Sequence, residues 1–161
     1  MNKFLTKEQF IAAKASNPYW ADRWNYLGSV VEFLKTISIE SSIELGSKEL
    51  KLISDSLTMG IEDEPDILHD AREPFPFKDK QFDLFIALQV WEHLEFSQYD
   101  AFKEVMRTCN KALLSFPYLW DCPKDPSHHM IDTAKIAEWT CDVEPVKQWV
   151  CNARIFYYFE F

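Results

Sequence analysis

The sequence predicts an α/β fold with a mostly parallel sheet, and three patterns carry this prediction. From residue 41 onward, short apolar runs typical of strands alternate with segments of helical periodicity, as in βαβ units. The run Phe82–Leu88 is almost continuously apolar, which is typical of a central parallel strand covered on both faces. Residues 146–150 and 154–161 are separated by a short Cys-Asn-Ala turn and predict a C-terminal antiparallel hairpin.

The length of 161 residues favours a single domain, in which residues 1–37 form an N-terminal helical segment and residues 41–161 form the sheet core. Helical periodicity is found at residues 6–15 and again at residues 19–36. One apolar stripe follows the second of these helices and consists of Trp20, Trp24, Leu27, Val31 and Leu34. This stripe predicts a helix that packs against the sheet.

The first strands follow one another closely. We expect strands at residues 42–45, 57–61 and 66–69. Only ten residues separate Gly46 from Leu57, and four separate Ile61 from Asp66. A parallel crossover normally needs a dozen residues or more, so the first crossovers of this sheet are shortened.

The second half of the core has the regular alternation. An amphipathic helix is expected at residues 97–109 and a buried strand at residues 112–116. A long loop, residues 117–132, carries three Pro and two His, and a short helix capped by Thr133 follows it.

Composition excludes several classes of function. The net charge is −9 and Lys and Arg form no cluster, which argues against nucleic acid and anionic membranes as partners. The N-terminus lacks the apolar run of a signal peptide, and no stretch is long enough to span a bilayer. The four Cys form no Cys-x-x-Cys pair. These features predict a cytoplasmic protein with reduced thiols, whose partner is a small-molecule substrate.

The segment from Asp66 to Leu94 contains the most specific pattern. A strand ends in Asp70-Ala71, a Pro-Phe turn follows, Phe-Asp-Leu opens the next strand at Phe82, and Glu-His-Leu comes after that strand. This order and spacing resemble the central part of the Rossmann-like, or class I, S-adenosylmethionine-dependent methyltransferases. The resemblance extends more weakly from residue 41 through the final hairpin. It implies S-adenosylmethionine as the cofactor and methyl transfer as the reaction.

The resemblance also implies roles for residues at the first two strand ends. Glu44 and Gly46 match the Glu-x-Gly of the first cofactor loop, which includes Ser47. The glycine would let the backbone approach the methionine portion of the cofactor. The glutamate would order the loop and bind the ammonium group. Glu62 matches the acid that accepts from both ribose hydroxyls, with Asp63 as the alternative. An acidic run such as residues 62–64 is also typical of a solvated loop.

Further candidates follow the third and fourth strands. Asp70 and Ala71 match the pair that meets the adenine edge, and Gln89 and Trp91 would flank the cofactor. The location agrees with a general rule, because open α/β sheets bind ligands outside the carboxyl ends of their strands. Asp70 could alternatively cap the turn before Arg72.

Three histidines are the candidates for catalysis. Methyl transfer is an in-line displacement that needs alignment, plus a base when the acceptor is a hydroxyl. His93 follows the fourth strand, and His128 and His129 lie on the loop after the fifth strand, at the same sheet edge. His93 could instead serve only to pack the start of a helix. The set Cys122, His128, His129 and Asp132 matches no zinc spacing, so no metal site is predicted, and a metal-dependent hydrolase remains a minor alternative.

Two features favour a different class of function. The first cofactor loop of this family is usually Gly-rich, whereas this chain has only Gly46 there. Together with the short crossovers, this supports the alternative of a non-catalytic binding or scaffold protein that keeps the fold. The aromatic content of 16% favours a core rich in Trp and Phe; the alternative is that exposed aromatic side chains form a homodimer through the C-terminal hairpin or the Trp-bearing helix.

Overall fold

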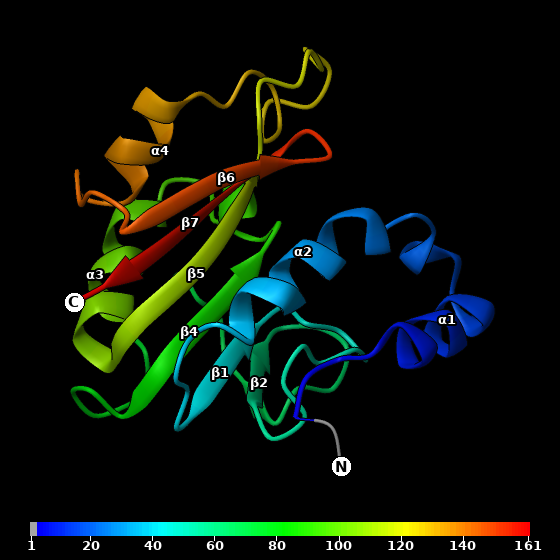
Figure 1. The fold of residues 1–161 in the computed structure, drawn as a ribbon. Helices are drawn as coiled ribbons and strands as arrows, with labels where there is room; N and C mark the ends of the chain where they lie inside the picture. The colour runs from blue at the N-terminus through cyan, green and yellow to red at the C-terminus, as the bar shows by residue number, and fades with distance from the viewer. Residues whose placement is uncertain (1–2) are drawn as a thin grey trace.

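A seven-stranded sheet in the order β3-β2-β1-β4-β5-β7-β6 runs through the computed structural model, which describes residues 3–161 (Figure 1). Strands β1 to β5 are parallel to one another, and β7 is antiparallel to both β5 and β6. The predicted parallel sheet and C-terminal hairpin are therefore confirmed. The strands are β1 (Ser42–Leu45), β2 (Leu57–Gly60), β3 (Ile67–Leu68), β4 (Phe82–Leu88), β5 (Cys109–Pro117), β6 (Lys147–Cys151) and β7 (Arg154–Glu160).

Helices cover both faces of the sheet. Side chains alternate along β4, so that Leu84 and Ile86 face one layer while Phe85 and Ala87 face the other. The helix α2 (Trp24–Leu34) packs on the first face, with α1 (Lys7–Ser16) packed against α2, and α3 (Gln98–Thr108) and α4 (Thr133–Trp139) pack on the second face (Figure 1). Because both faces are covered, β4 is apolar at every position except Asp83, as its sequence predicted.

The N-terminal segment is helical, as expected, but α2 begins later than its apolar stripe suggested. A short 3-10 helix, η1 (Pro18–Trp20), comes first, and Asp22 then takes a positive φ of 60°. This left-handed residue interrupts the helix, so α2 starts at Trp24. Trp20 still lies buried on the same apolar layer as the helix that follows.

The first two crossovers contain no helix, in agreement with their short lengths. Residues 46–56 and 61–66 are loops and turns, yet β1, β2 and β3 pair in parallel. The predicted strand at residues 66–69 is reduced to the two residues of β3. Consequently, the carboxyl ends of β1 and β2 lead directly into loops rather than into covering helices.

The cap of α4 differs from the prediction. Asp132, not Thr133, is the N-cap, and its carboxylate accepts a hydrogen bond from Lys135 N at 2.8 Å. Thr133 is the first residue of the helix and does not cap it, contrary to the prediction. The cap lies one residue earlier because Asp132 has the extended backbone that a capping residue needs (φ −110°, ψ 177°).

Replacement of Asp132 by alanine is expected to lower the free energy of unfolding by about 1 kcal/mol, because the N–H of Lys135 loses its acceptor. Urea denaturation measures this change. Thr133→Ala is the matched control and should change the stability by less than about 0.5 kcal/mol. Equal losses in the two variants would contradict the assignment of the cap to Asp132.

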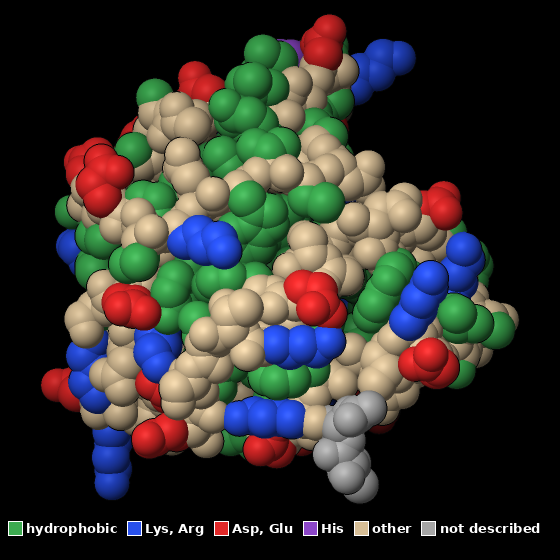
Figure 2. Space-filling view, viewed as in Figure 1, with side chains coloured by type: hydrophobic (Ala, Val, Ile, Leu, Met, Phe, Trp, Pro, Cys, Tyr) green, Lys and Arg blue, Asp and Glu red, His purple; other side chains and the backbone are tan. Residues whose placement is uncertain are grey.

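The surface carries charges of both signs. Figure 2 shows Lys and Arg interspersed with Asp and Glu over the visible face, without a gathered basic patch on that face. Within residues 3–161, no helix combines the length and the apolar character that crossing a bilayer requires.

Candidate functional site

A cavity of about 540 Å³ lies at the carboxyl ends of β1, β2 and β4. The strand order reverses at this point, since the chain runs outward from β1 to β3 on one side and from β4 to β5 on the other. Open α/β sheets bind ligands at such a switch point, where loops diverge and leave a crevice. The volume falls within the range of about 300 to 1,000 Å³ for small-molecule sites.

Gly46 forms the part of the cavity wall that follows β1. Its φ is +66°, in the left-handed region that favours glycine, and its N–H donates to the carbonyl of Met59 at 3.0 Å. A Cβ at this position would lie 2.8 Å from Val90 Cγ2. The glycine therefore serves two purposes, because it permits the turn and leaves room for the Val90 side chain.

Most of the residues that the resemblance assigned to the cofactor lie together around this cavity. Those that line it are Gly46, Ser47, Glu62, Asp63, Asp70, Ala71 and Gln89, together with His93 from the catalytic candidates. Ser47 Oγ is buried and has no hydrogen-bond partner among residues 3–161. A ligand in the cavity could supply the missing partner.

The carboxylates at the edge of the cavity differ in whether a basic side chain of the protein already binds them. Arg72 donates to both oxygens of Asp70, the shortest contact being 2.6 Å, and this guanidinium holds the pKa of Asp70 down at about 2. Asp63 Oδ2 accepts from Lys48 Nζ at 2.8 Å. Glu62 has no ion-pair partner within residues 3–161. Glu62 is therefore freer to accept from a ligand than Asp63.

Glu44 lies away from this cavity, although the family pattern placed it in the first cofactor loop. Its two carboxylate oxygens accept from the backbone N–H groups of Leu52 and Ile53, both at 2.9 Å. Burial raises the pKa of Glu44 to about 7. The side chain thus orders the loop that follows β1, as expected, but it does not line the cavity and is not placed to bind the ammonium group.

Trp91 does not flank the cavity either, and this expectation is corrected. The short 3-10 helix η2 (Trp91–His93) turns its first residue into the core, where the indole is fully buried. Its ring meets Phe85 and Phe102 edge to face, with centroids 6.2 and 6.4 Å apart. Gln89, at φ +57°, does line the cavity, and its side-chain amide donates to Ser115 Oγ at 3.1 Å.

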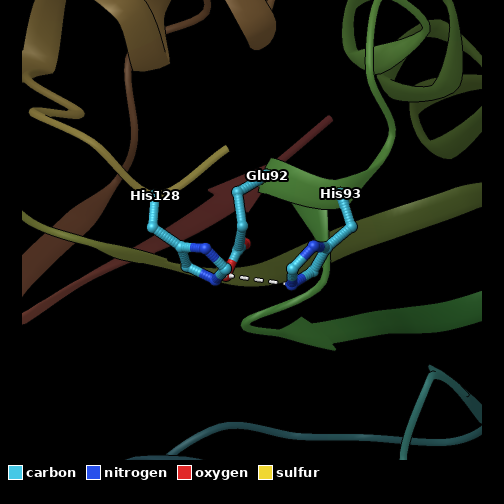
Figure 3. Close-up of side chains that lie close together, drawn as sticks. All are labelled: Glu92, His93 and His128. Atoms are coloured by element: carbon cyan, nitrogen blue, oxygen red, sulfur yellow. Dashed lines mark ion pairs between the residues drawn. The ribbon is translucent and has the colours of Figure 1, made fainter. Parts of the chain in front are cut away.

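A second group of polar side chains adjoins the cavity wall at His93. The Glu92 carboxylate lies between the imidazoles of His93 and His128, and both rings point a nitrogen toward it (Figure 3). Glu92 Oε1 is 3.7 Å from His128 Nε2 and 4.0 Å from His93 Nε2. Neither Glu92 oxygen has a hydrogen-bond partner within residues 3–161. Burial raises the pKa of this carboxyl to about 8.

The long loop after β5 holds His128 in a fixed orientation. Asp125 Oδ2 is 2.7 Å from His128 Nδ1, and Trp120 stacks on the imidazole at 5.8 Å between ring centroids. His129 points elsewhere, since its Nδ1 accepts from the N–H of Cys122 at 3.1 Å. Of the adjacent histidines, the structure therefore brings only His128 to the cavity side, and neither one lines the cavity itself.

Glu92 is the residue of this group that sequence reasoning missed as a site candidate. Glu92 belongs to the Glu-His-Leu run of the family pattern, which implied no role for this residue in the site. A Glu directly before a candidate His at the end of a buried strand could have indicated a shared site. Its burial, however, depends on the loop of residues 118–131, which lies far away in the sequence.

The comparisons with known proteins agree with the fold. Residues 42–112 match the family model described as a methyltransferase domain. The N-methyltransferase NodS from Bradyrhizobium japonicum has a similar structure at a TM-score of 0.61 and 15% identity, over 89% of this chain and 97% of that one. No functionally curated protein matches the sequence significantly.

Two further solved structures are similar over most of their length. Magnesium protoporphyrin IX methyltransferase from Synechocystis, solved with bound S-adenosylhomocysteine, gives a TM-score of 0.58 at 12% identity, over 86% of this chain and 83% of that one. A methyltransferase from Aquifex aeolicus that depends on S-adenosylmethionine gives a TM-score of 0.56 at 10% identity, over 79% and 86%. At such identities the likeness concerns the fold.

Proposed function

We propose that this chain is a short member of the class I S-adenosylmethionine-dependent methyltransferases and that it methylates a hydroxyl group of a small molecule with S-adenosylmethionine as the methyl donor. One observation carries the proposal. Seven of the nine residues that the family pattern assigns to the cofactor, all except Glu44 and Trp91, come from four separate segments and line one cavity at the switch point of the sheet.

The residues present fit this cofactor. Gly46 lines the cavity at the end of β1, where the methionine portion is expected, and the buried Ser47 hydroxyl lacks a partner among the described residues. Glu62 is available to accept from ribose hydroxyls. Asp70 is ionised, and although Arg72 occupies both its oxygens, a carboxylate has further lone pairs that can accept from an adenine amine.

The chemistry divides between cofactor and chain. S-adenosylmethionine supplies a methyl group that is activated by its sulfonium. The chain contributes proximity and alignment, which are worth about 7 to 11 kcal/mol when two reactants are held in a near-attack geometry. His93 lines the cavity next to Glu92 and His128, so these side chains are the ones placed to bind and orient the acceptor hydroxyl.

Calorimetric titration of the protein with S-adenosylmethionine and S-adenosylhomocysteine tests the proposal. We expect both to bind with one site per chain. An assay with methyl-labelled cofactor and a collection of hydroxyl-bearing metabolites then identifies the acceptor. If neither ligand binds at millimolar concentration, the proposed function is wrong.

The two neighbouring acids in the loop after β2 give a sharper prediction. Glu62→Gln is expected to weaken S-adenosylhomocysteine binding roughly 10-fold, since a hydrogen bond to a charged group is worth about 1.5 to 3 kcal/mol. Asp63→Asn is the matched control and should change the affinity less than about 3-fold, because Lys48 already occupies that carboxylate. If Asp63→Asn loses more affinity than Glu62→Gln does, Asp63 and not Glu62 is the acid that binds the ribose.

A non-catalytic binding protein is the second candidate, and one observation favours it. Residues 46–56 contain no helix, so the loop after β1 lacks the helix that normally packs over it. This candidate predicts that the protein binds S-adenosylhomocysteine and S-adenosylmethionine but transfers no label to any acceptor.

A further inference from the structure

We propose that Glu92, His93 and His128 form a binding site for a divalent transition-metal ion beside the cofactor cavity. The site combines two segments that are far apart in the sequence, namely η2 and the loop of residues 118–131. Two imidazole nitrogens and one carboxylate oxygen converge there and lie within 4.8 Å of one another. Figure 3 shows the carboxylate between the two rings.

The buried carboxylate points to a cation. Glu92 is 3% exposed, and neither of its oxygens has a hydrogen-bond partner among residues 3–161. A buried carboxyl group without partners is costly, and proteins normally pair such groups or let them coordinate metals. The Arg154 guanidinium acts on Glu92 only through space and makes no ion pair with it within the described chain. An ion at this point would give the Glu92 carboxylate a cationic partner.

The side chains must close somewhat around a bound ion. In a tetrahedral zinc site, two ligand atoms that each lie about 2.1 Å from the ion are about 3.4 Å apart. Glu92 Oε1 is 3.7 Å from His128 Nε2 and 4.0 Å from His93 Nε2, and the three ligand atoms lie within 4.8 Å of one another. The two imidazoles must therefore approach each other by up to about 1.4 Å, which rotation of the partly exposed His93 can supply.

The partner of His128 fixes the ring for this role. Asp125 Oδ2, at 2.7 Å from Nδ1, favours the tautomer with the proton on Nδ1. The lone pair of Nε2 is then directed at the Glu92 side. Ser127 Oγ holds Asp125 in turn, at 2.6 Å. Metal-binding histidines are commonly oriented by such a carboxylate on their second nitrogen.

The donor set selects the class of ion. Two imidazoles and one carboxylate hold zinc in several catalytic sites and iron in others, and both kinds of site leave coordination positions open. Magnesium and calcium prefer oxygen ligands, so this set disfavours them. We therefore expect ions from manganese to zinc to bind, with zinc among the tightest.

The position suggests what the open coordination sites bind. His93 also lines the cofactor cavity, so an acceptor oxygen bound to the ion would lie next to the methyl donor. This consequence rests on the proposed function, whereas the metal site itself does not. Bound to a divalent ion, an acceptor hydroxyl loses its proton more readily.

The test is calorimetric titration of chelator-treated full-length protein with Zn²⁺, Mn²⁺ and Mg²⁺. We expect one equivalent of Zn²⁺ and of Mn²⁺ to bind, and Mg²⁺ to bind at least about 10-fold more weakly than Mn²⁺. Glu92→Gln, His93→Ala and His128→Ala should each weaken binding at least 10-fold, and Asp125→Asn should weaken it about 10-fold. His93 is half exposed, so we expect the His93 variant to fold. It therefore tests metal binding even if the Glu92 variant fails to fold.

The adjacent histidine supplies the matched control. His129 and Cys122 lie together and could bind Zn²⁺ adventitiously, but Mn²⁺ has little affinity for thiols. Mn²⁺ affinity should be unchanged in His129→Ala. The proposal is overturned if no Mn²⁺ or Zn²⁺ binds, or if His129→Ala weakens Mn²⁺ binding as much as His128→Ala does.

Titration with S-adenosylhomocysteine separates the two proposals. If the metal binds but S-adenosylhomocysteine does not, the metal site stands and the proposed function fails. If His93→Ala and His128→Ala lose the metal yet methylate the acceptor at an unchanged rate, the link between the ion and the acceptor is overturned.

Discussion

Replacement of Gly46 by valine is expected to weaken S-adenosylhomocysteine binding by at least about 100-fold, which corresponds to about 2.7 kcal/mol. The positive φ of Gly46 strains any branched residue, and a Cβ would lie 2.8 Å from Val90 Cγ2. The loop after β1 must then move, and the cavity wall moves with it. Calorimetric titration of the variant measures the loss.

Gly60→Ala is the control for this substitution. Gly60 lines the same cavity, but apart from its two chain neighbours a Cβ there would come no closer than 3.9 Å to any atom within the described residues. The affinity of the Gly60→Ala variant for S-adenosylhomocysteine should fall less than about 5-fold. If Gly46→Val binds the ligand as tightly as the wild type does, the methionine portion does not bind against the loop after β1.

The stability of the protein should fall as the pH rises from 4.5 to 7, because of Glu44. Burial raises the pKa of this carboxyl in the folded state to about 7, above its ordinary value of 4.5. The unfolded chain therefore releases its proton first as the pH increases, and ionisation favours unfolding. From this group alone we expect a loss of up to about 3 kcal/mol across that window, with no further loss above it.

Glu44→Gln isolates this contribution. Glutamine cannot titrate, and its amide nitrogen cannot accept from the N–H groups of Leu52 and Ile53, so the variant is less stable at pH 5 by about 1 to 3 kcal/mol. Urea denaturation at pH 5 and pH 8 should find a smaller stability difference between the two proteins at the higher pH. A difference that stays constant with pH would contradict the raised pKa.

Much of the fold could be predicted because its signals are local. The apolar run of β4 and the turn between β6 and β7 each identify an element within a few residues. The short spacing around Gly46 also predicted the loss of covering helices. The start of α2 was missed, because the left-handed backbone at Asp22 interrupts a stripe that looks continuous in sequence.

The site was predictable only where a residue's position in the chain determines its place in the sheet. Gly46, Asp70 and Gln89 follow strand ends, so parallel pairing brings them to one edge. The inward turn of Trp91 depends on the phase of one short 3-10 helix, which the sequence does not specify. The burial of Glu92 beside His128 depends on how a fourteen-residue loop, residues 118–131, folds back over the strand end.

A crystal structure of the protein with S-adenosylhomocysteine would show whether the cavity at the switch point is the cofactor site. We expect one ligand there, with its methionine portion against Gly46 and Ser47, its ribose at Glu62 and its adenine at Asp70. A ligand bound at another place, or a complex in which this cavity stays empty at saturating ligand, would rule out this cavity as the cofactor site.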